Sequence, residues 1–159
     1  METISDKIET GQPFGLYDIL DELQTSVTAL EDKDTAREVL DGVCGATIVV
    51  AEKDTDEWYA TIQLTDYAGD DMAVAGSVIV YLSSVATGLD FNTATVTTET
   101  AITDDGSLAI LLAKIAYLVT SEADGDIKLT LTDTGADIYY LVVVLPNGTL
   151  VVSEAITFA

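Results

Sequence analysis

The apolar residues in the first part of the chain recur with the period of a helix. Five of them are spaced four, three, four and three residues apart, and these are Leu16, Leu20, Leu23, Val27 and Leu30. This spacing places all five along one helix face, in the heptad pattern of a short coiled coil. Because two heptads do not make a helix that is stable alone in water, we expect the stripe to pack against the rest of the chain, a copy of itself or a partner.

Two aromatic residues at the start of this segment favour docking to a partner or a second copy. Phe14 and Tyr17 flank Leu16, and an amphipathic helix that binds in a groove uses apolar anchors at such spacings. We therefore predict that Phe14, Tyr17 and the five stripe residues form a partner or oligomer interface. A second short helix is predicted from Asp34, as its N-cap, to Gly42.

After this helical segment the pattern changes from helical to alternating. In residues 57–65 the side chains of Trp58, Ala60, Ile62 and Leu64 share one face, with mainly polar side chains opposite. Trp58 is expected to anchor a core, and an exposed interface position is the alternative. Further strands are predicted over residues 46–51, 74–82, 94–102, 126–132, 137–145 and 150–158, with 94–102 as a polar edge strand.

Two further segments predict short connections between neighbouring strands. The run from Leu108 to Val119 is nearly all apolar and is interrupted by Lys114. Its period would also suit a helix, but the turn residues around it favour one strand, or two strands joined at a bend. Pro146-Asn147-Gly148 predicts a tight hairpin turn between the last two strands.

About seven strands at roughly ten-residue spacing, with turn residues between them, predict a mainly β chain that folds as an antiparallel β-sandwich. The change of period places a boundary near residues 42–45. Residues 1–44 are then a short α-helical N-terminal arm for anchoring or oligomerisation, and residues 45–159 are the sandwich. No internal repeat is visible, so the chain holds a single copy of the sandwich.

Charge narrows the range of partners. The chain has 28 acidic and 6 basic residues and a net charge of −22. Such a chain repels the phosphates of nucleic acids and anionic membrane surfaces, so we expect no binding to either. The first residues lack the basic and apolar regions of a secretory signal, and no stretch approaches the roughly 20 apolar residues of a membrane span. We therefore expect synthesis in a cytoplasm.

Most catalytic chemistry lacks its usual residues. There is no histidine and one cysteine, Cys44, which removes Ser–His and Cys–His nucleophiles, thiolate metal clusters and an intrachain disulfide. Paired carboxylates also serve glycosidases, but here they lie in short turns without an aromatic platform for a sugar. The sequence therefore predicts no enzyme and no catalytic residues.

Carboxylate clusters are the remaining candidate sites. Asp66, Asp70 and Asp71 share one predicted turn, and Asp124 and Asp126 flank a glycine. Loops rich in oxygen ligands suit Ca²⁺, the one cofactor that these residues suggest. The alternative is a solvated turn in which each Asp supports the bend through hydrogen bonds to the nearby backbone.

Three segments together carry a family resemblance. TIQLTDYAGDDMAVAGSVIV at residues 61–80 and TSEADGDIKLTLT at 120–132 place alternating strand residues beside Asp/Gly turns. They resemble strands of bacterial immunoglobulin-like (Ig-like) domains of the invasin and intimin type. DTGADIYY at 133–140 resembles the tyrosine corner of Ig-like domains. The resemblance implies an Ig-like sandwich over about residues 56–159, in which the hydroxyl of Tyr139 or Tyr140 bonds to upstream backbone.

A second resemblance concerns the whole chain. A helical arm, one sandwich and the ending YLVVVLPNG…SEAITFA are similar to small structural proteins from the head and tail gene clusters of tailed phages. This implies a non-enzymatic capsid decoration, or cement, protein on the virion surface, made in the host cytoplasm. Its partner would be the major capsid protein or another virion protein. We expect a homo-oligomer, and a trimer because capsids offer local three-fold positions.

Two other functions remain open at this point. One is a tail or fibre adhesin that binds a host surface glycan or protein, which Ca²⁺ in the Asp loops would favour. The other is a bacterial surface or matrix protein. Invasin-type adhesins carry secretion signals and tandem repeats, and the sequence shows neither, so the virion is the preferred setting.

Overall fold

The computed structural model describes residues 23–28, 42–91 and 96–159. The chain divides into two units, Met1–Leu40 and Asp41–Ala159. In the first unit, residues 23–28 form a helical segment, in which the Thr28 hydroxyl donates to the Gln24 carbonyl at 3.0 Å. A helix is thus present at the centre of the predicted stripe, and the short helix predicted from Asp34 lies outside the described residues.

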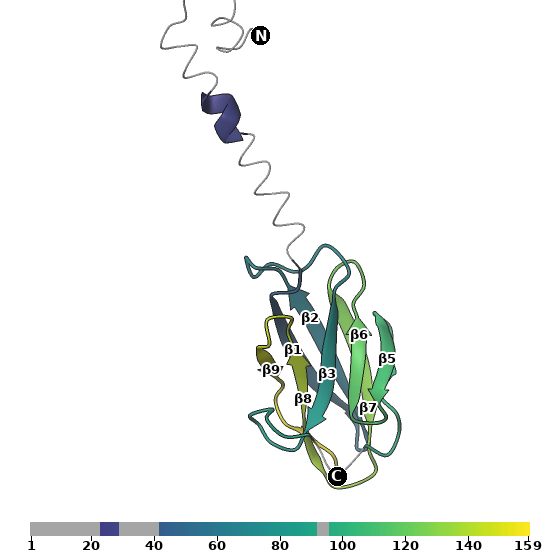
Figure 1. The fold of residues 1–159 in the computed structure, drawn as a ribbon. Helices are drawn as coiled ribbons and strands as arrows, with labels where there is room; N and C mark the ends of the chain where they lie inside the picture. Colours follow the sequence, from purple (N-terminus) through teal and green to yellow (C-terminus); the bar gives the residue numbers. More distant parts are fainter. Residues whose placement is uncertain (1–22, 29–41, 92–95) are drawn as a thin grey trace, which may run out of the picture. The chain divides into compact units, whose positions relative to one another are not determined.

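The second unit is built from strands and turns (Figure 1). Over its described residues the strands are β1 (Gly45–Asp54), β2 (Glu57–Thr65), β3 (Ser77–Ser83), β4 (Ala101–Ile102), β5 (Ser107–Leu112), β6 (Ala116–Thr120), β7 (Asp126–Thr132), β8 (Ile138–Val144), β9 (Leu150–Val152) and β10 (Ile156–Thr157). One sheet has the order β1-β2-β7-β4, and the other has the order β10-β8-β3-β6-β5, with β9 also paired to β8. All named pairs are antiparallel.

One hydrophobic core lies between the two sheets, which confirms the predicted β-sandwich. In β2 the alternating residues Ala60, Ile62 and Leu64 are fully buried, and β7 contributes Ile127 and Leu129 in the same way. The six-stranded sheet supplies the opposite side of this core from β3, β6 and β8. Burying each large aliphatic side chain contributes about 1.5–3 kcal/mol, so the alternation in these strands largely determines the fold.

Both predicted close connections are confirmed. At Pro146-Asn147-Gly148 the Leu145 amide donates to the Thr149 carbonyl at 2.9 Å, and Gly148 has a φ of 84°. A positive φ is free of steric cost for glycine, which explains the residue at this position. The apolar run 108–119 forms β5 and β6, and the bend between them contains Lys114 with a φ of 63°.

Three predicted strands differ from the observed ones. The segment 150–158 is not one strand but β9 and β10, because the Ser153 hydroxyl accepts from the Leu141 amide at 2.9 Å and donates to the Glu154 carbonyl at 2.7 Å. A side chain that replaces a ladder bond in this way interrupts a strand. In the segment 94–102 the strand β4 covers Ala101–Ile102, at the edge of the four-stranded sheet. The strand predicted from residue 74 begins at Ser77.

Candidate docking surface

The six-stranded sheet carries apolar side chains on both of its faces. Because side chains alternate along a strand, residues between the core positions point away from the core. Strand pairing aligns these outward residues across the sheet in two neighbouring rows. The first row consists of Val152, Val142, Tyr81 and Ala116, and the second of Leu150, Val144, Ile79, Leu118 and Ala109. Neither row contains a charged residue.

The first row, which we call the covered row, lies beneath the loop of residues 84–91. The Tyr81 hydroxyl donates to the Gly88 carbonyl, and its ring lies 4.7 Å from that of Phe91. A Cβ on Gly88 would approach Val142 and Val152 to within 3.0–3.3 Å. Val142 is 0% exposed although it points away from the main core. The covered row forms a second, smaller core, and Ile115, Val144 and Leu150 also pack against it.

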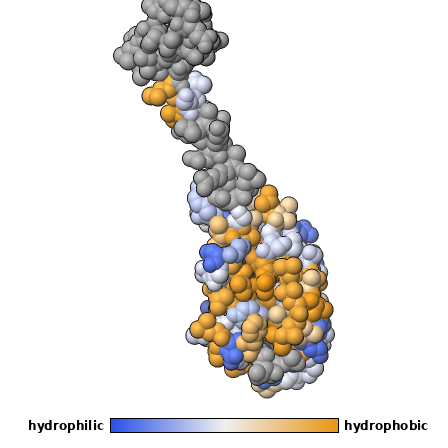
Figure 2. Space-filling model, in the orientation of Figure 1, coloured by the Kyte–Doolittle hydropathy of each residue, from blue (hydrophilic) through white to orange (hydrophobic). Residues whose placement is uncertain are grey.

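The second row, which we call the open row, is accessible to solvent. Ile79 is 42% exposed and Leu118 is 39% exposed, although both lie in inner strands of the sheet. Figure 2 shows apolar residues gathered over this face, where Figure 1 places β8, β3 and β6. A contiguous apolar surface on a chain of such high charge is typical of a binding site for another protein.

The covering loop extends this apolar surface. Val85, Leu89 and Phe91 all have exposed side chains. The loop is held to the sheet by the Tyr81 hydroxyl and by a bond of 3.0 Å from the Ser83 hydroxyl to the Val85 carbonyl. We define the candidate docking surface as the open row together with these three loop residues.

The opposite face of the sandwich is polar. Outward positions of the four-stranded sheet pair Thr47 with Gln63 and Thr61 with Lys128. The ammonium groups of Lys53 and Lys128 lie 5.2 and 5.1 Å from the Tyr59 ring centroid.

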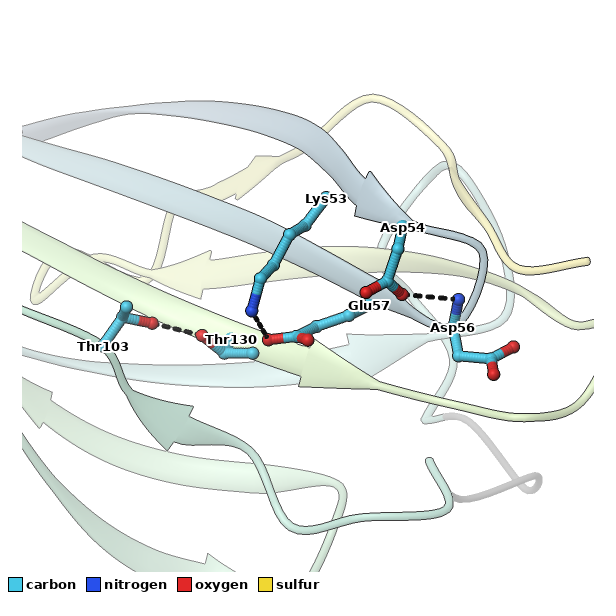
Figure 3. A network of polar contacts seen from close by, with 6 residues as sticks. All are labelled: Lys53, Asp54, Asp56, Glu57, Thr103 and Thr130. Carbon is cyan, nitrogen blue, oxygen red and sulfur yellow. Dashed lines mark hydrogen bonds and ion pairs between the residues drawn. The ribbon is translucent and has the colours of Figure 1, made fainter.

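Ion pairs and hydrogen bonds cover much of this polar face. Lys53 pairs with Glu57 at 2.6 Å (Figure 3), and Lys128 pairs with Asp104 at 3.0 Å. Hydrogen bonds to these carboxylates are the main cause that raises the pKa of both lysines. Figure 3 also shows Thr103 bonded to Thr130 on this sheet.

Two residues of the predicted interface on the arm lie within the described part of the chain. Leu23 and Val27 lie in the helical segment 23–28, and both side chains are exposed. Their spacing of four residues places them on one helix face, as predicted. The other predicted interface residues, Phe14, Leu16, Tyr17, Leu20 and Leu30, lie outside the described residues.

The first carboxylate cluster forms the turn that the sequence predicts. The Asp66 carboxylate accepts from the amides of Ala68 at 2.9 Å and Asp70 at 3.0 Å, and Gly69 has a φ of 86°. These bonds are those of an Asp that supports a bend. Asp71 lies beyond the turn and forms an isolated bridge with Thr65.

The second carboxylate cluster lies near the first. Burial, and then the charges of Asp124, Asp105 and Asp71, raise the pKa of Asp126. Within the described part of the chain, no three acidic or cysteine side chains are arranged to hold a metal ion. Ca²⁺ binding therefore stays a prediction from sequence.

The tyrosine-corner segment is held by a buried carboxylate. The Tyr139 hydroxyl donates to Asp133 Oδ2 at 2.7 Å, and Asp133 is 4% exposed. The resemblance implied a bond to upstream backbone, whereas this bond goes to an upstream side chain. Tyr140 points to the outer face, opposite Ser83.

Asp133 also joins segments that are far apart in sequence. Its Oδ1 accepts from the Thr97 amide at 3.2 Å, from the Thr97 hydroxyl and from the Gly135 amide at 3.3 Å. Burial raises the pKa of Asp133, but the hydrogen bonds from Thr97, Tyr139 and Gly135 outweigh it, so the pKa lies below its ordinary value. Burial and the bond to Asp133 raise the pKa of Tyr139.

Two other residues that the sequence singled out have clear positions. Trp58 packs against the core, with its ring 6.5 Å from that of Phe158 in an edge-to-face arrangement, as predicted for a core anchor. Cys44 is a free cysteine, and it is exposed.

The sequence reasoning missed the docking surface, although a signal for it was present. Strand β8 reads Ile-Tyr-Tyr-Leu-Val-Val-Val, without the polar alternate positions seen in β2. A strand without alternation is apolar on both faces, and both faces then need a cover. Comparisons of the chain with protein families, curated proteins and solved structures find no match. No helix in the described ranges is long and apolar enough to span a membrane.

Proposed function

We propose that this chain is a non-enzymatic structural protein of a tailed-phage virion, a decoration protein on the capsid. Its helical arm anchors it, and its sandwich packs the candidate docking surface against the major capsid protein or another virion protein. The observation that carries the proposal is the open row, an uncharged and partly exposed row of side chains in the inner strands of a sheet.

The order of strands supports an Ig-like domain as the displayed module. Constant-type Ig domains have strands A, B, E and D in one sheet and C, F and G in the other. Taking β1, β2, β3, β4, β7 and β8 as A to F gives A-B-E-D for the four-stranded sheet and places C beside F in the other. Strands β9 and β10 then share the place of G, and the β5–β6 hairpin is an insertion beside C.

The charge of the sandwich indicates the chemistry of its partner. Residues 45–159 contain 17 acidic and three basic residues, whereas the open row contains none. A fitting partner offers an apolar patch bordered by basic side chains, because such a border attracts the acidic rim and the patch excludes water. Acidic surfaces elsewhere keep decorated particles apart.

The experiment is to ask whether the chain is carried on particles and through which face. A tagged copy is expressed in the producing host in place of the native one, and particles are purified by density gradient. We expect the wild type on the particles and about tenfold or greater loss for the double variant Ile79→Lys/Leu118→Lys, because two charges enter the open row. The matched control is Val49→Lys on exposed β1, which should be retained.

Two outcomes would overturn parts of this proposal separately. Absence of the wild-type chain from purified particles removes the virion setting. Equal retention of wild type and double variant, with both proteins folded by circular dichroism, removes the docking role of the open row. Loss of Val49→Lys together with the double variant would instead show that the added charge, and not its position, prevents attachment.

A further inference from the structure

Among the described residues, the hairpin of β5 and β6 leaves one strand edge without a paired neighbour. Strand β5 pairs with β6 on one side and ends the order of the six-stranded sheet, with no described strand beyond it. Its six residues contain no charge and no proline. Ile110, Leu111 and Leu112 are each more than half exposed. An edge of this composition is suited to pairing with another strand.

The other long edge strand differs in the features that block such pairing. Strand β1, at the edge of the four-stranded sheet, ends in Glu52, Lys53 and Asp54 and has a bulge between Glu52 and Asp54. Charges and bulges on an edge are devices that prevent association. Strand β5 has a bulge between Ile110 and Leu112, but Ser107–Ile110 remains regular and none of its residues is charged.

The charges that flank β5 favour one kind of occupant. Asp105 lies two residues before the strand, and Lys114 lies two residues after it, in the bend to β6. If two copies of β5 pair antiparallel, the acidic end of each strand lies beside the lysine end of the other. A parallel arrangement would place like charges together, which is unfavourable. The strand is therefore electrostatically complementary to itself in the antiparallel direction.

We propose that two copies of this chain pair antiparallel through β5, so that their six-stranded sheets join into one. The interface is isologous, because the same strand serves both copies about a two-fold axis. It lies at the sheet edge and goes beyond the proposed function, which uses the outer face. Pairing also makes the docking surfaces of the two copies continuous.

A charge-swap experiment on the full-length chain tests the pairing. Asp105→Lys places lysines at both ends of the interface, and Lys114→Glu places carboxylates at both ends. We expect each single variant to dissociate about tenfold more readily than the wild type, as measured by sedimentation equilibrium. An equimolar mixture of the two variants should recover the wild-type affinity, because each like-charge contact then becomes an opposite-charge contact. Recovery on mixing requires pairing between copies of this chain.

A cross-linking experiment covers the case in which Lys114→Glu destabilises the fold, since the Lys114 ammonium also donates to the Thr97 carbonyl at 2.7 Å. In a Cys44→Ser background, Ala109→Cys lies near the expected two-fold axis, and Val49→Cys lies on the other exposed edge strand. We expect mild oxidation to link Ala109→Cys at least about tenfold faster than Val49→Cys.

Either of two results would overturn the proposal. One is an equal rate of cross-linking for Ala109→Cys and Val49→Cys. The other is a charge-swap experiment in which the single variants and their mixture all sediment like the wild type. Ile79→Lys should dimerise normally, so failure of the docking surface is recognised separately.

Discussion

The two outer faces of the sandwich are built on the same strand alternation but differ in what lies above them. On the four-stranded sheet, the outward residues are mainly polar. They include threonines, glutamine and lysines, with Val49 and Tyr59 among them. On the six-stranded sheet, the outward residues are apolar, and a loop covers one row and leaves the next open. The first face therefore needs no cover from solvent, whereas the second face is shielded from solvent only where the loop lies.

This difference separates buried from solvent-exposed residues within one outer face. The covered row behaves as core, because Val142 is fully buried and Tyr81 is 7% exposed. Within the open row, Ile79 and Leu118 gain little from folding, since their side chains remain partly in water, whereas Val144 and Leu150 pack against the covered row. Two residues of one strand, such as Tyr81 and Ile79 of β3, can thus point to the same face and yet be buried and exposed respectively.

The largest effect is expected in the covered row. Tyr81→Ala should lower the free energy of unfolding by about 3 kcal/mol, because it removes a buried ring, its contact with Phe91 and its bond to Gly88. The matched control is Tyr59→Ala on the four-stranded sheet, for which we expect less than about 1 kcal/mol. Urea denaturation followed by circular dichroism measures both. Equal losses would mean that the loop contributes no core.

A smaller effect is expected at the buried carboxylate that supports both sheets. Asp133→Asn should lower the free energy of unfolding by about 1–2 kcal/mol near neutral pH, because the charge-assisted hydrogen bonds from Thr97 and Tyr139 weaken. The lowered pKa of Asp133 means that its contribution is fully present above its unfolded pKa, which is about 3.9. It is lost as pH falls through the lower folded value.

The pH dependence of that difference is the measurement. Unfolding free energies of wild type and Asp133→Asn are compared from neutral pH to below pH 4, so that the other carboxylates cancel in the difference. We expect the gap to be constant above about pH 5 and to shrink below about pH 4. A gap that widens in acid would show that the pKa of Asp133 is raised, and would assign burial as the dominant cause.

The sequence predicted the parts of this structure that carry a local signal. Alternation in β2 and turn residues such as Gly69 and Gly148 give strands and bends directly, because each is determined by neighbours along the chain. The sequence also singled out the tyrosine-corner segment, but the resemblance implied a bond from the tyrosine hydroxyl to backbone, whereas the Tyr139 hydroxyl donates to the Asp133 side chain.

The rest depends on contacts that alternation does not encode. Thr97 reaches Asp133 across 36 residues, and no periodicity indicates that pair. The apolar strand β8 could have been covered on its outer side by a helix, a loop or a partner. The loop that covers part of it has no periodic pattern, and Gly88 is small because Val142 and Val152 lie close to it. Only the three-dimensional arrangement separates the covered row from the open row.

A still smaller effect on stability is expected in the open row. Ile79→Lys should change the free energy of unfolding by less than about 1 kcal/mol, because the side chain is already partly in water. It should, however, reduce the binding of a hydrophobic dye such as ANS by the native protein. Val49→Lys, which replaces a side chain that is 65% exposed on β1, should leave dye binding unchanged. Strong destabilisation by Ile79→Lys would place the open row in the core.

The smallest effect is expected on the polar face. Lys128→Met keeps most of the stem over Tyr59 but removes the ammonium that pairs with Asp104 at 3.0 Å. We expect a slight loss of stability that disappears in high salt, because exposed ion pairs are screened. The pKa of Lys128 in the folded protein is raised above its ordinary value of about 10.5. The loss of stability should therefore also disappear as the pH rises through this raised pKa, because the wild-type lysine then becomes neutral. Ile79→Met on the open row should be insensitive to salt. If the loss from Lys128→Met persisted in high salt, packing of the lysine stem on Tyr59 would be its cause, and the four-stranded sheet would then also rely on apolar cover.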